Sequence, residues 1–405
     1  MMLRNIIYSP LSSLFLVVIS SSFFLTFISV KINIIDGSQI TLGLIHSAFY
    51  GGMLIGSLKS EEIINRIGHI RAFTLFSSIL TFIIILQALY QIPKFWILLR
   101  FFSGLATAAI YIIIESWLLA QANQKNKGKI LSIYMICLYS AQTIGQFGID
   151  IVDINTIEPF LFAALLASIS IIPAALTYTK APEIKPLPKM AVIKYFKASP
   201  IGFIGCVVSG LILSGIYGFL PNYAMDNNIS VSILLGVTIT GGFVLQWPIG
   251  KLSDMFNRIK IVTLLVFMIT VLCLTFTLVP LEGILVYIFS FFLGGFSFAL
   301  YPLCIAQVCD CVNNSNIINI ASSLLFAYGI GAVTGPIVLA FCIKIYSSIA
   351  VLYYISIISC FLLFYCLYSF RTIKGISQKD QVKFVVVPRV LSVASAITPR
   401  LDDKK

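Results

Sequence analysis

The feature that most constrains this chain is a succession of apolar runs, each close to the length of a membrane span, separated by short polar loops. A helix needs about 20 apolar residues to cross the hydrocarbon core of a bilayer, where every backbone polar group must find its partner inside the protein. The runs are too long and too uniformly apolar for the strands of a barrel. We therefore predict transmembrane helices near residues 11–32, 41–59, 72–91, 95–119, 129–151, 158–178, 201–222, 231–250, 261–279, 283–308, 318–342 and 349–370.

The composition is that of a membrane protein: 59% of the residues are hydrophobic and 10% are charged, whereas soluble domains carry about 25% charged residues. A net charge of +12 would suggest a nucleic-acid partner in a soluble protein. Here the basic residues lie in loops between apolar runs, so we expect no nucleic acid. Cys309 and Cys311 lack the paired spacing and the histidines of a zinc site, and we expect no metal, cofactor or disulfide framework.

The loop charges predict the orientation of the chain. If both termini are cytoplasmic, the inner segments hold nearly all of the lysines and arginines, and the outer loops hold only Lys31, Lys94 and Lys344. The run at 11–32 is too long for a signal peptide and has no A-x-A-like cleavage site, so we expect a retained span. We predict an integral protein of the bacterial inner membrane.

A polar, basic and proline-rich segment divides the apolar runs into two sets of six. It predicts a six-helix bundle at 1–178, a cytoplasmic linker at 179–200, a second six-helix bundle at 201–370 and a cytoplasmic tail at 371–405. The tail sequence "VKFVVVPRVLSV" is too short and too interrupted to span a membrane. Packing on the inner face and binding of a partner are both open for it.

The two halves repeat each other. In the fourth run Arg100, Gly104, Thr107 and Tyr111 have the same spacing as Ser290, Gly294, Ser297 and Tyr301 in the tenth, each position 190 residues later. Spacings of 4, 3 and 4 keep residues on one face of a helix. A polar stripe facing lipid would be costly, so we expect each stripe to face the interior of a bundle or a water-filled cavity. Two charged loops, "EEIINRIGHIR" and "GKLSDMFNRIK", also recur, each after the second span of its half.

These features resemble the major facilitator superfamily, whose loop signature is G-x-x-x-D-R-x-G-R-R. The second loop keeps Gly250, Asp254, Arg258 and Lys260 and has Asn257 in place of the inner glycine, whereas the first keeps Arg66, Gly68 and Arg71 but has Glu61 and Asn65 where glycine and aspartate are expected. "RFFSGLATAA" resembles the fourth-span motif of the superfamily, and "GAVTGP" the eleventh-span one. "IIIESWLL", "QWPIGKLSD" and "LYP" are most similar to its YcaD-like branch.

The resemblance covers the chain to about residue 370 and implies a fold of two pseudo-symmetric six-helix bundles. It also implies a monomer and alternating access to a site near the middle of the membrane. The charged loops would then be cytoplasmic gate latches, with Arg66, Gly68, Arg71, Gly250, Asp254 and Arg258 as gating residues. The simpler alternative is that these charges only fix the orientation of the chain.

Two ionisable residues lie inside the fourth span. Arg100 either extends to the outer surface or holds an anionic or polar substrate group or an acidic partner, for which Asp150 is a candidate. Glu115 is fifteen residues further along, roughly 22 Å away, so the two cannot pair. We predict that Glu115 is a gating residue that pairs with Arg66, Arg71 or Lys127. A proton carrier and a solvated helix end are the alternatives.

Other features bear on coupling. His46 is the single histidine predicted inside the membrane, and we expect it to be a packing residue rather than a proton relay. The first, seventh and tenth spans have no acid in their middle, which argues against simple proton antiport and against a strongly cationic substrate.

The remaining polar residues of the spans are hydroxyls, amides and aromatic rings, which suit a small neutral or zwitterionic metabolite or drug-like molecule. The predicted substrate-binding residues are Arg100, Thr107, Tyr111, Tyr139, Gln142, Gln146, Tyr217, Asn222, Gln246, Trp247, Tyr301 and Tyr328. A packing role is the alternative for each of the amides and aromatic residues.

The sequence therefore predicts a secondary active transporter whose partners are a small-molecule substrate, the lipid bilayer and a coupling proton or ion. The chain has no GxSxG, HExxH or Walker motif and only two histidines, so we do not expect an enzyme. The alternative function is a degenerate superfamily member that acts as a receptor or scaffold without flux. Glu61 and Asn65, the departures in the first loop, favour that alternative.

Overall fold

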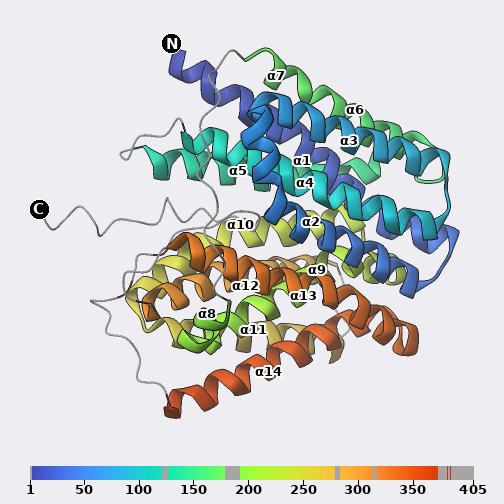
Figure 1. The fold of residues 1–405 in the computed structure, drawn as a ribbon. Coiled ribbons are helices and arrows are strands. Elements are labelled where there is room, and N and C mark those ends of the chain that lie inside the picture. The colour runs from blue at the N-terminus through green and yellow to red at the C-terminus, as the bar shows by residue number, and fades with distance from the viewer. Residues whose placement is uncertain are drawn as a thin grey trace, which may run out of the picture. The chain divides into compact units, whose positions relative to one another are not determined.

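The structure is a computed structural model that describes residues 2–120, 126–177, 192–278, 283–312 and 317–372, together with residues 381 and 384. Within these residues the chain is helical and contains no strand (Figure 1). Twelve of the described helical segments are long and apolar enough to cross a membrane. The predicted spans and the all-α membrane class are therefore confirmed.

The first half contains α1 (Met2–Ile35), α2 (Gln39–Ile67), α3 (His69–Leu89), α4 (Pro93–Ala120), α5 (Lys127–Gln146), the short 3₁₀ helix η1 (Phe147–Asp150), α6 (Glu158–Ile169) and α7 (Ile171–Ala175). The second half contains α9 (Pro200–Asp226), α10 (Val231–Met255), α11 (Arg258–Leu278), α12 (Ile284–Cys311), α13 (Ile317–Tyr346) and α14 (Ala350–Thr372). A further helix, α8 (Val192–Ala198), lies in the predicted linker. The linker before it, and the tail apart from residues 381 and 384, lie outside the described residues.

The chain forms two compact units that do not follow the predicted halves. Unit 1 contains Met1–Pro186, Ser214–Thr240 and Val333–Val351, and unit 2 contains Leu187–Leu213, Gly241–Ala332 and Leu352–Lys405. Unit 1 therefore combines the first six spans with the ends of α9, α10 and α13 that the loop charges place on the outer side. The division into bundles at 1–178 and 201–370 stays a prediction.

In unit 1, α2 and α4 cross in close contact because glycine occupies both sides of the crossing (Figure 1). A methyl group at Gly52 would lie 1.9 Å from the carbonyl oxygen of Phe101, and one at Gly104 would lie 2.0 Å from that of Phe49. Small residues allow helix backbones in a membrane to approach this closely. The crossing recurs in unit 2, where a methyl group at Gly241 would lie 1.9 Å from the carbonyl oxygen of Phe291.

Aromatic packing fixes the other side of α4. Phe160 of α6 lies edge-on to Phe27 of α1 at 4.9 Å and contacts Trp96 of α4 at 5.7 Å between ring centroids. All three side chains are buried. Edge-to-face pairs add about 0.5–1.5 kcal/mol to the effect of burial. The first turns of α4, which carry Arg100, are therefore held between α2 and the α1–α6 pair.

Candidate functional site

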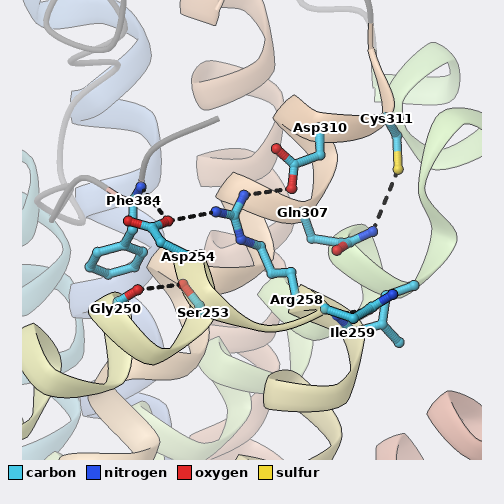
Figure 2. Close-up of polar contacts among 10 residues, drawn as sticks. Gly250, Ser253, Asp254, Arg258, Ile259, Gln307, Asp310, Cys311 and Phe384 are labelled. Atoms are coloured by element: carbon cyan, nitrogen blue, oxygen red, sulfur yellow. Dashed lines mark hydrogen bonds and ion pairs between the residues drawn. The ribbon is translucent and has the colours of Figure 1, made fainter. Parts of the chain in front are cut away.

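The second charged loop holds a buried ion pair (Figure 2). Arg258, at the start of α11, donates from Nη1 to Asp310 Oδ2 of α12 at 2.6 Å and from Nη2 to Asp254 Oδ1 of α10 at 3.1 Å. The Arg258 and Asp310 side chains are each 1% exposed, and that of Asp254 is 35% exposed. Asp254 thus pairs with a neighbouring base, and sequence reasoning missed the second acidic neighbour of that base, Asp310. Its one signal was its place in the "CDC" stretch considered for metal binding.

Asn257 explains how this loop works without the glycine of the superfamily signature. Its side chain accepts a hydrogen bond from the backbone N–H of Ile259 at 3.0 Å, and α11 begins at the next residue, Arg258. Asparagine is among the preferred residues at a helix N-cap. The cap therefore fixes the start of α11 and, with it, the position of the Arg258 side chain.

The first charged loop has different chemistry. His69, 189 residues before Arg258, stands at the start of α3, and its Nε2 lies 3.0 Å from Ser116 Oγ of α4. Gly68 has a φ of +84°, which favours glycine and allows α2 to end and α3 to begin without a loop. Arg66 and Arg71 are exposed. The structure therefore places a histidine–serine contact where the second half has its buried ion pair.

Glu115 is buried in α4, with 1% of its surface exposed. Neither of its carboxylate oxygens has a hydrogen-bond partner among the described residues, and no ion pair to Arg66 or Arg71 is formed. The buried hydroxyl of Tyr134 is likewise without a described partner. The predicted ion pairs of Glu115 with Arg66 and Arg71 are therefore absent from this conformation, the Lys127 side chain lies outside the described part of the chain, and the gating role of Glu115 stays a prediction.

Arg100 is buried in α4, with 2% of its surface exposed. Its guanidinium carbon lies 4.2 Å from the ring centroid of Phe49 and 5.8 Å from that of Phe24. Its Nε and Nη2 groups have no acceptor among the described residues. The predicted alternative partner, Asp150, instead accepts a hydrogen bond from Ser232 of α10. Arg100 is thus held by aromatic faces and retains unused donors.

Two predicted binding residues, both tyrosines, contact the side-chain amide of a third. Gln142 of α5 accepts a hydrogen bond from the hydroxyl of Tyr217 on α9 at 3.3 Å, and its side chain interacts with that of Tyr111 on α4. Tyr111 is buried, whereas Gln142 and Tyr217 are partly exposed. This cluster brings together three helices of unit 1 through polar side chains.

Other predicted binding residues are engaged in local structure. Gln146 is buried, and both the oxygen and the nitrogen of its side-chain amide bond to α1. The oxygen accepts from Thr26 at 2.7 Å, and the nitrogen donates to Ser22 at 2.6 Å. Thr107 donates to the carbonyl of Ser103 in the previous turn of α4 at 2.8 Å. Tyr139 is buried in α5. These contacts fit the packing alternative in this conformation.

The remaining candidates in unit 2 have varied surroundings. The rings of Tyr301 on α12 and Tyr328 on α13 lie 5.0 Å apart, and both residues are buried. Gln246 of α10 is buried, but Trp247 is 69% exposed. Adjacent helical residues point about 100° apart, so these two neighbours present their side chains in different directions.

Polar contacts join the ends of α9, α10 and α13 to the first six spans within unit 1. Ser29 Oγ of α1 lies 2.8 Å from His46 Nε2 of α2 and donates to the carbonyl of Gly218 on α9 at 3.0 Å. Asn222 of α9 donates to Gln39 of α2 at 3.0 Å. His46 is completely buried, which fits its predicted packing role.

The contact of α13 with α2 is close. The hydroxyl of Ser47 donates to the carbonyl of Val333 at 2.5 Å, and a methyl group at Gly43 would lie 2.7 Å from the carbonyl oxygen of Pro336. Pro336 belongs to the "GAVTGP" stretch. Gly43 thus allows the two helices to approach closely, and the Ser47 hydrogen bond joins them.

The described residues hold twelve candidate membrane spans, two buried ionisable side chains on one of them and an ion-paired loop, which define a multi-span membrane protein. The profile of the Major Facilitator Superfamily matches residues 11–325, and the chain belongs to that superfamily.

Curated relatives agree with the predicted branch. An uncharacterized MFS-type transporter of Enterobacter sp. (strain 638) is 28% identical over 318 residues, which cover 76% of this chain and 81% of the relative. The uncharacterized MFS-type transporter YcaD of Escherichia fergusonii is 28% identical over 317 residues, with the same shares covered. The resemblance to YcaD-like proteins is therefore confirmed.

Solved structures share the fold. The nucleoside transporter NupG has a TM-score of 0.75 at 14% identity, covering 91% of this chain and 100% of its own. A D-xylose-proton symporter has a TM-score of 0.70 at 13% identity, covering 93% and 99%. At these identities the likeness shows the fold alone.

Proposed function

We propose that this protein is a secondary active transporter that moves a small neutral or zwitterionic molecule across the inner membrane by alternating access. The observation that carries the proposal is the pair of buried ionisable side chains on α4, Arg100 and Glu115. Ionisable groups inside a membrane are costly and mark substrate or ion pathways. Neither group is neutralised by an opposite charge in the described part of the chain, so each is available to a ligand.

Arg100 binds a polar or anionic group of the substrate in this proposal. Its Nε and Nη2 donors are unused, and the rings of Phe49 and Phe24 hold the guanidinium in place. The Tyr111–Gln142–Tyr217 cluster supplies neutral hydrogen-bonding groups on the same unit. A zwitterion or a polar neutral molecule satisfies both kinds of group.

Glu115 carries the coupling proton in this proposal. An ionised carboxylate that is buried without a partner costs several kcal/mol, so the geometry favours a bound proton in this conformation. Release of the proton would require a conformation in which Glu115 meets water or a base. The solved D-xylose-proton symporter, by its description, shows that this fold accommodates a proton-coupled transporter.

The gate consists of contacts that are individually weak. The ends of α9, α10 and α13 join the first six spans through single hydrogen bonds, such as Asn222 to Gln39, which contribute about 1 kcal/mol each. The two charged loops are the gate latches on the cytoplasmic side. One contains Gly250, Asp254 and Arg258, and the other contains Arg66, Gly68 and Arg71. The protein works as a monomer with both termini in the cytoplasm.

The first test is untargeted mass spectrometry of cells and medium from wild-type, deletion and Arg100→Ala strains. We expect one compound to shift between cells and medium in the deletion strain, and the Arg100→Ala profile to match the deletion because the substrate loses its charged partner. Lys94→Ala, an exposed basic residue on the same helix, serves as the control and should match the wild type. Unchanged profiles in both mutant strains under several growth conditions would favour the receptor or scaffold alternative.

Glu115→Gln tests the coupling. We expect the variant to fold, because the amide has the same shape and carries no charge, and to lose gradient-driven movement of the identified compound to background while equilibrium exchange continues. The measurement uses membrane vesicles with an imposed pH gradient. Glu62→Gln, an exposed acid on α2, is the matched control. Gradient-driven transport by Glu115→Gln at the wild-type rate would exclude Glu115 as the proton carrier.

A further inference from the structure

The last turns of α10 present a small surface that receives a residue of the tail. This surface consists of Gly250 and Asp254, and Phe384 lies against it (Figure 2). The backbone N–H of Phe384 donates to Asp254 Oδ1 at 2.8 Å. Phe384 follows Asp254 by 130 residues in the sequence. The contact is therefore a tertiary one between the tail and the second charged loop.

The phenyl ring of Phe384 packs against Gly250, where the absence of a side chain leaves room for it. A methyl group at Gly250 would lie 2.2 Å from Cδ1 and 2.3 Å from Cε1 of the Phe384 ring. Atoms do not approach so closely, so any side chain at position 250 would displace the ring. The group that Gly250 admits in this structure is an aromatic side chain of the tail.

Asp254 gives the backbone of the tail an acceptor. A carboxylate forms stronger hydrogen bonds than a neutral acceptor does, and the same Oδ1 also accepts from Arg258. Three residues before Phe384, Gln381 is only 8% exposed, so the tail is buried at a second position.

We propose that the Gly250–Asp254 surface is a docking site for the chain's own tail, at the segment that contains Gln381 and Phe384, and that the docked tail inhibits the gate. The second part rests on the proposed function, in which Asp254 is a gate latch. While the tail is docked, Asp254 Oδ1 accepts hydrogen bonds from both Phe384 and Arg258, so the tail adds one bond to this conformation of the latch. That extra hydrogen bond must break when Oδ1 moves to another partner, which makes the change less favourable while the tail is docked.

Hydrogen–deuterium exchange of the full-length protein in lipid nanodiscs tests the docking without any substrate. We expect the Phe384 amide to exchange about tenfold faster in Gly250→Ala than in the wild type, because the ring is displaced and the hydrogen bond to Asp254 is lost. Gly51→Ala is the matched control, because a methyl group there meets nothing within 4 Å. Phe384→Ala, which changes no helix, should accelerate the exchange of the same amide.

A Phe384 amide that is unprotected in the wild type, or equally protected in Gly250→Ala, would overturn the docking. The inhibitory part has its own readout in peptides from residues 214–226, whose α9 residues contact α1 and α2. We expect faster exchange there in Gly250→Ala and Phe384→Ala. An undocked tail lets the latch change its partner more often, and the contacts of α9 with α1 and α2 then break more often. Unchanged exchange at 214–226 would overturn the inhibition. Neither result depends on the metabolite profile of Arg100→Ala, so failure of the proposed transport remains distinguishable.

Discussion

Gly52→Ala is expected to destabilise the protein by about 3 kcal/mol or to prevent its folding. The new methyl group would lie 1.9 Å from the carbonyl oxygen of Phe101, and the next atoms it meets belong to the α4 backbone, which cannot rotate away as a side chain can. Overpacking of a tight interior costs about 1–3 kcal/mol, and occasionally more. Here α2 and α4 would have to separate along the crossing that holds Gly104 as well.

The neighbouring Gly51 provides a matched control. A methyl group at Gly51 meets nothing within 4 Å, so Gly51→Ala gains helix propensity, about 0.5–1 kcal/mol, and loses no contact. Thermal unfolding in detergent, followed by tryptophan fluorescence, reports on this region because Trp96 and Trp117 are both buried in α4. We expect a lower Tm for Gly52→Ala and an equal or higher Tm for Gly51→Ala. Equal Tm values for the two variants would contradict the close crossing of α2 and α4.

Arg258→Met is expected to destabilise the protein by about 3–5 kcal/mol, the usual effect of removing one partner from a buried ion pair. It leaves Asp310, 1% exposed, without its guanidinium. Asp254→Ala should cost much less, about 0–1 kcal/mol, because its carboxylate is partly exposed and screened by solvent. The free energy of unfolding, measured by chemical denaturation in mixed micelles, should therefore fall much more for Arg258→Met than for Asp254→Ala.

The double variant Arg258→Met/Asp310→Leu separates charge from packing. Replacing both members of a buried pair by apolar residues is often neutral or stabilising, so we expect the double variant to recover most of the stability lost in Arg258→Met. A coupling energy near zero in the double-mutant cycle would mean that the 2.6 Å contact contributes nothing to stability. A stable double variant also allows a separate test of whether the charges are needed for transport.

Much of the fold could be predicted from the sequence. The predicted run at 11–32 lies within the observed span Ile7–Ile35, and that at 261–279 lies almost entirely within Arg258–Leu278. The sixth span is less regular than predicted, because α6 ends at Ile169 and α7 begins at Ile171, shortly before Pro173. A proline lacks the N–H that the preceding turn would bond. Helix α8 within the linker was also missed, since its seven residues show no clear periodic pattern.

Less of the candidate site could be predicted. Asp254 and Arg258 are four residues apart, on either side of the short turn between α10 and α11, so their pairing could be anticipated from their nearness in the sequence. Asp310 could not be chosen in this way, since it is 52 residues from Arg258. The partners predicted for Glu115 were reasonable by depth in the membrane, but Arg66 and Arg71 are exposed while Glu115 is buried.

The sequence by itself determined the class of protein, the number and order of the spans and the internal repeat. These properties follow from local composition, because a bilayer admits a long apolar segment only as a helix whose backbone bonds are internal. Only the tertiary structure decided which side chains meet: Arg258 with Asp310, Ser29 with His46, and Phe384 with Gly250 and Asp254. Such pairs depend on how helices distant in the sequence cross, and the crossings depend on packing at single positions such as Gly52 and Gly104.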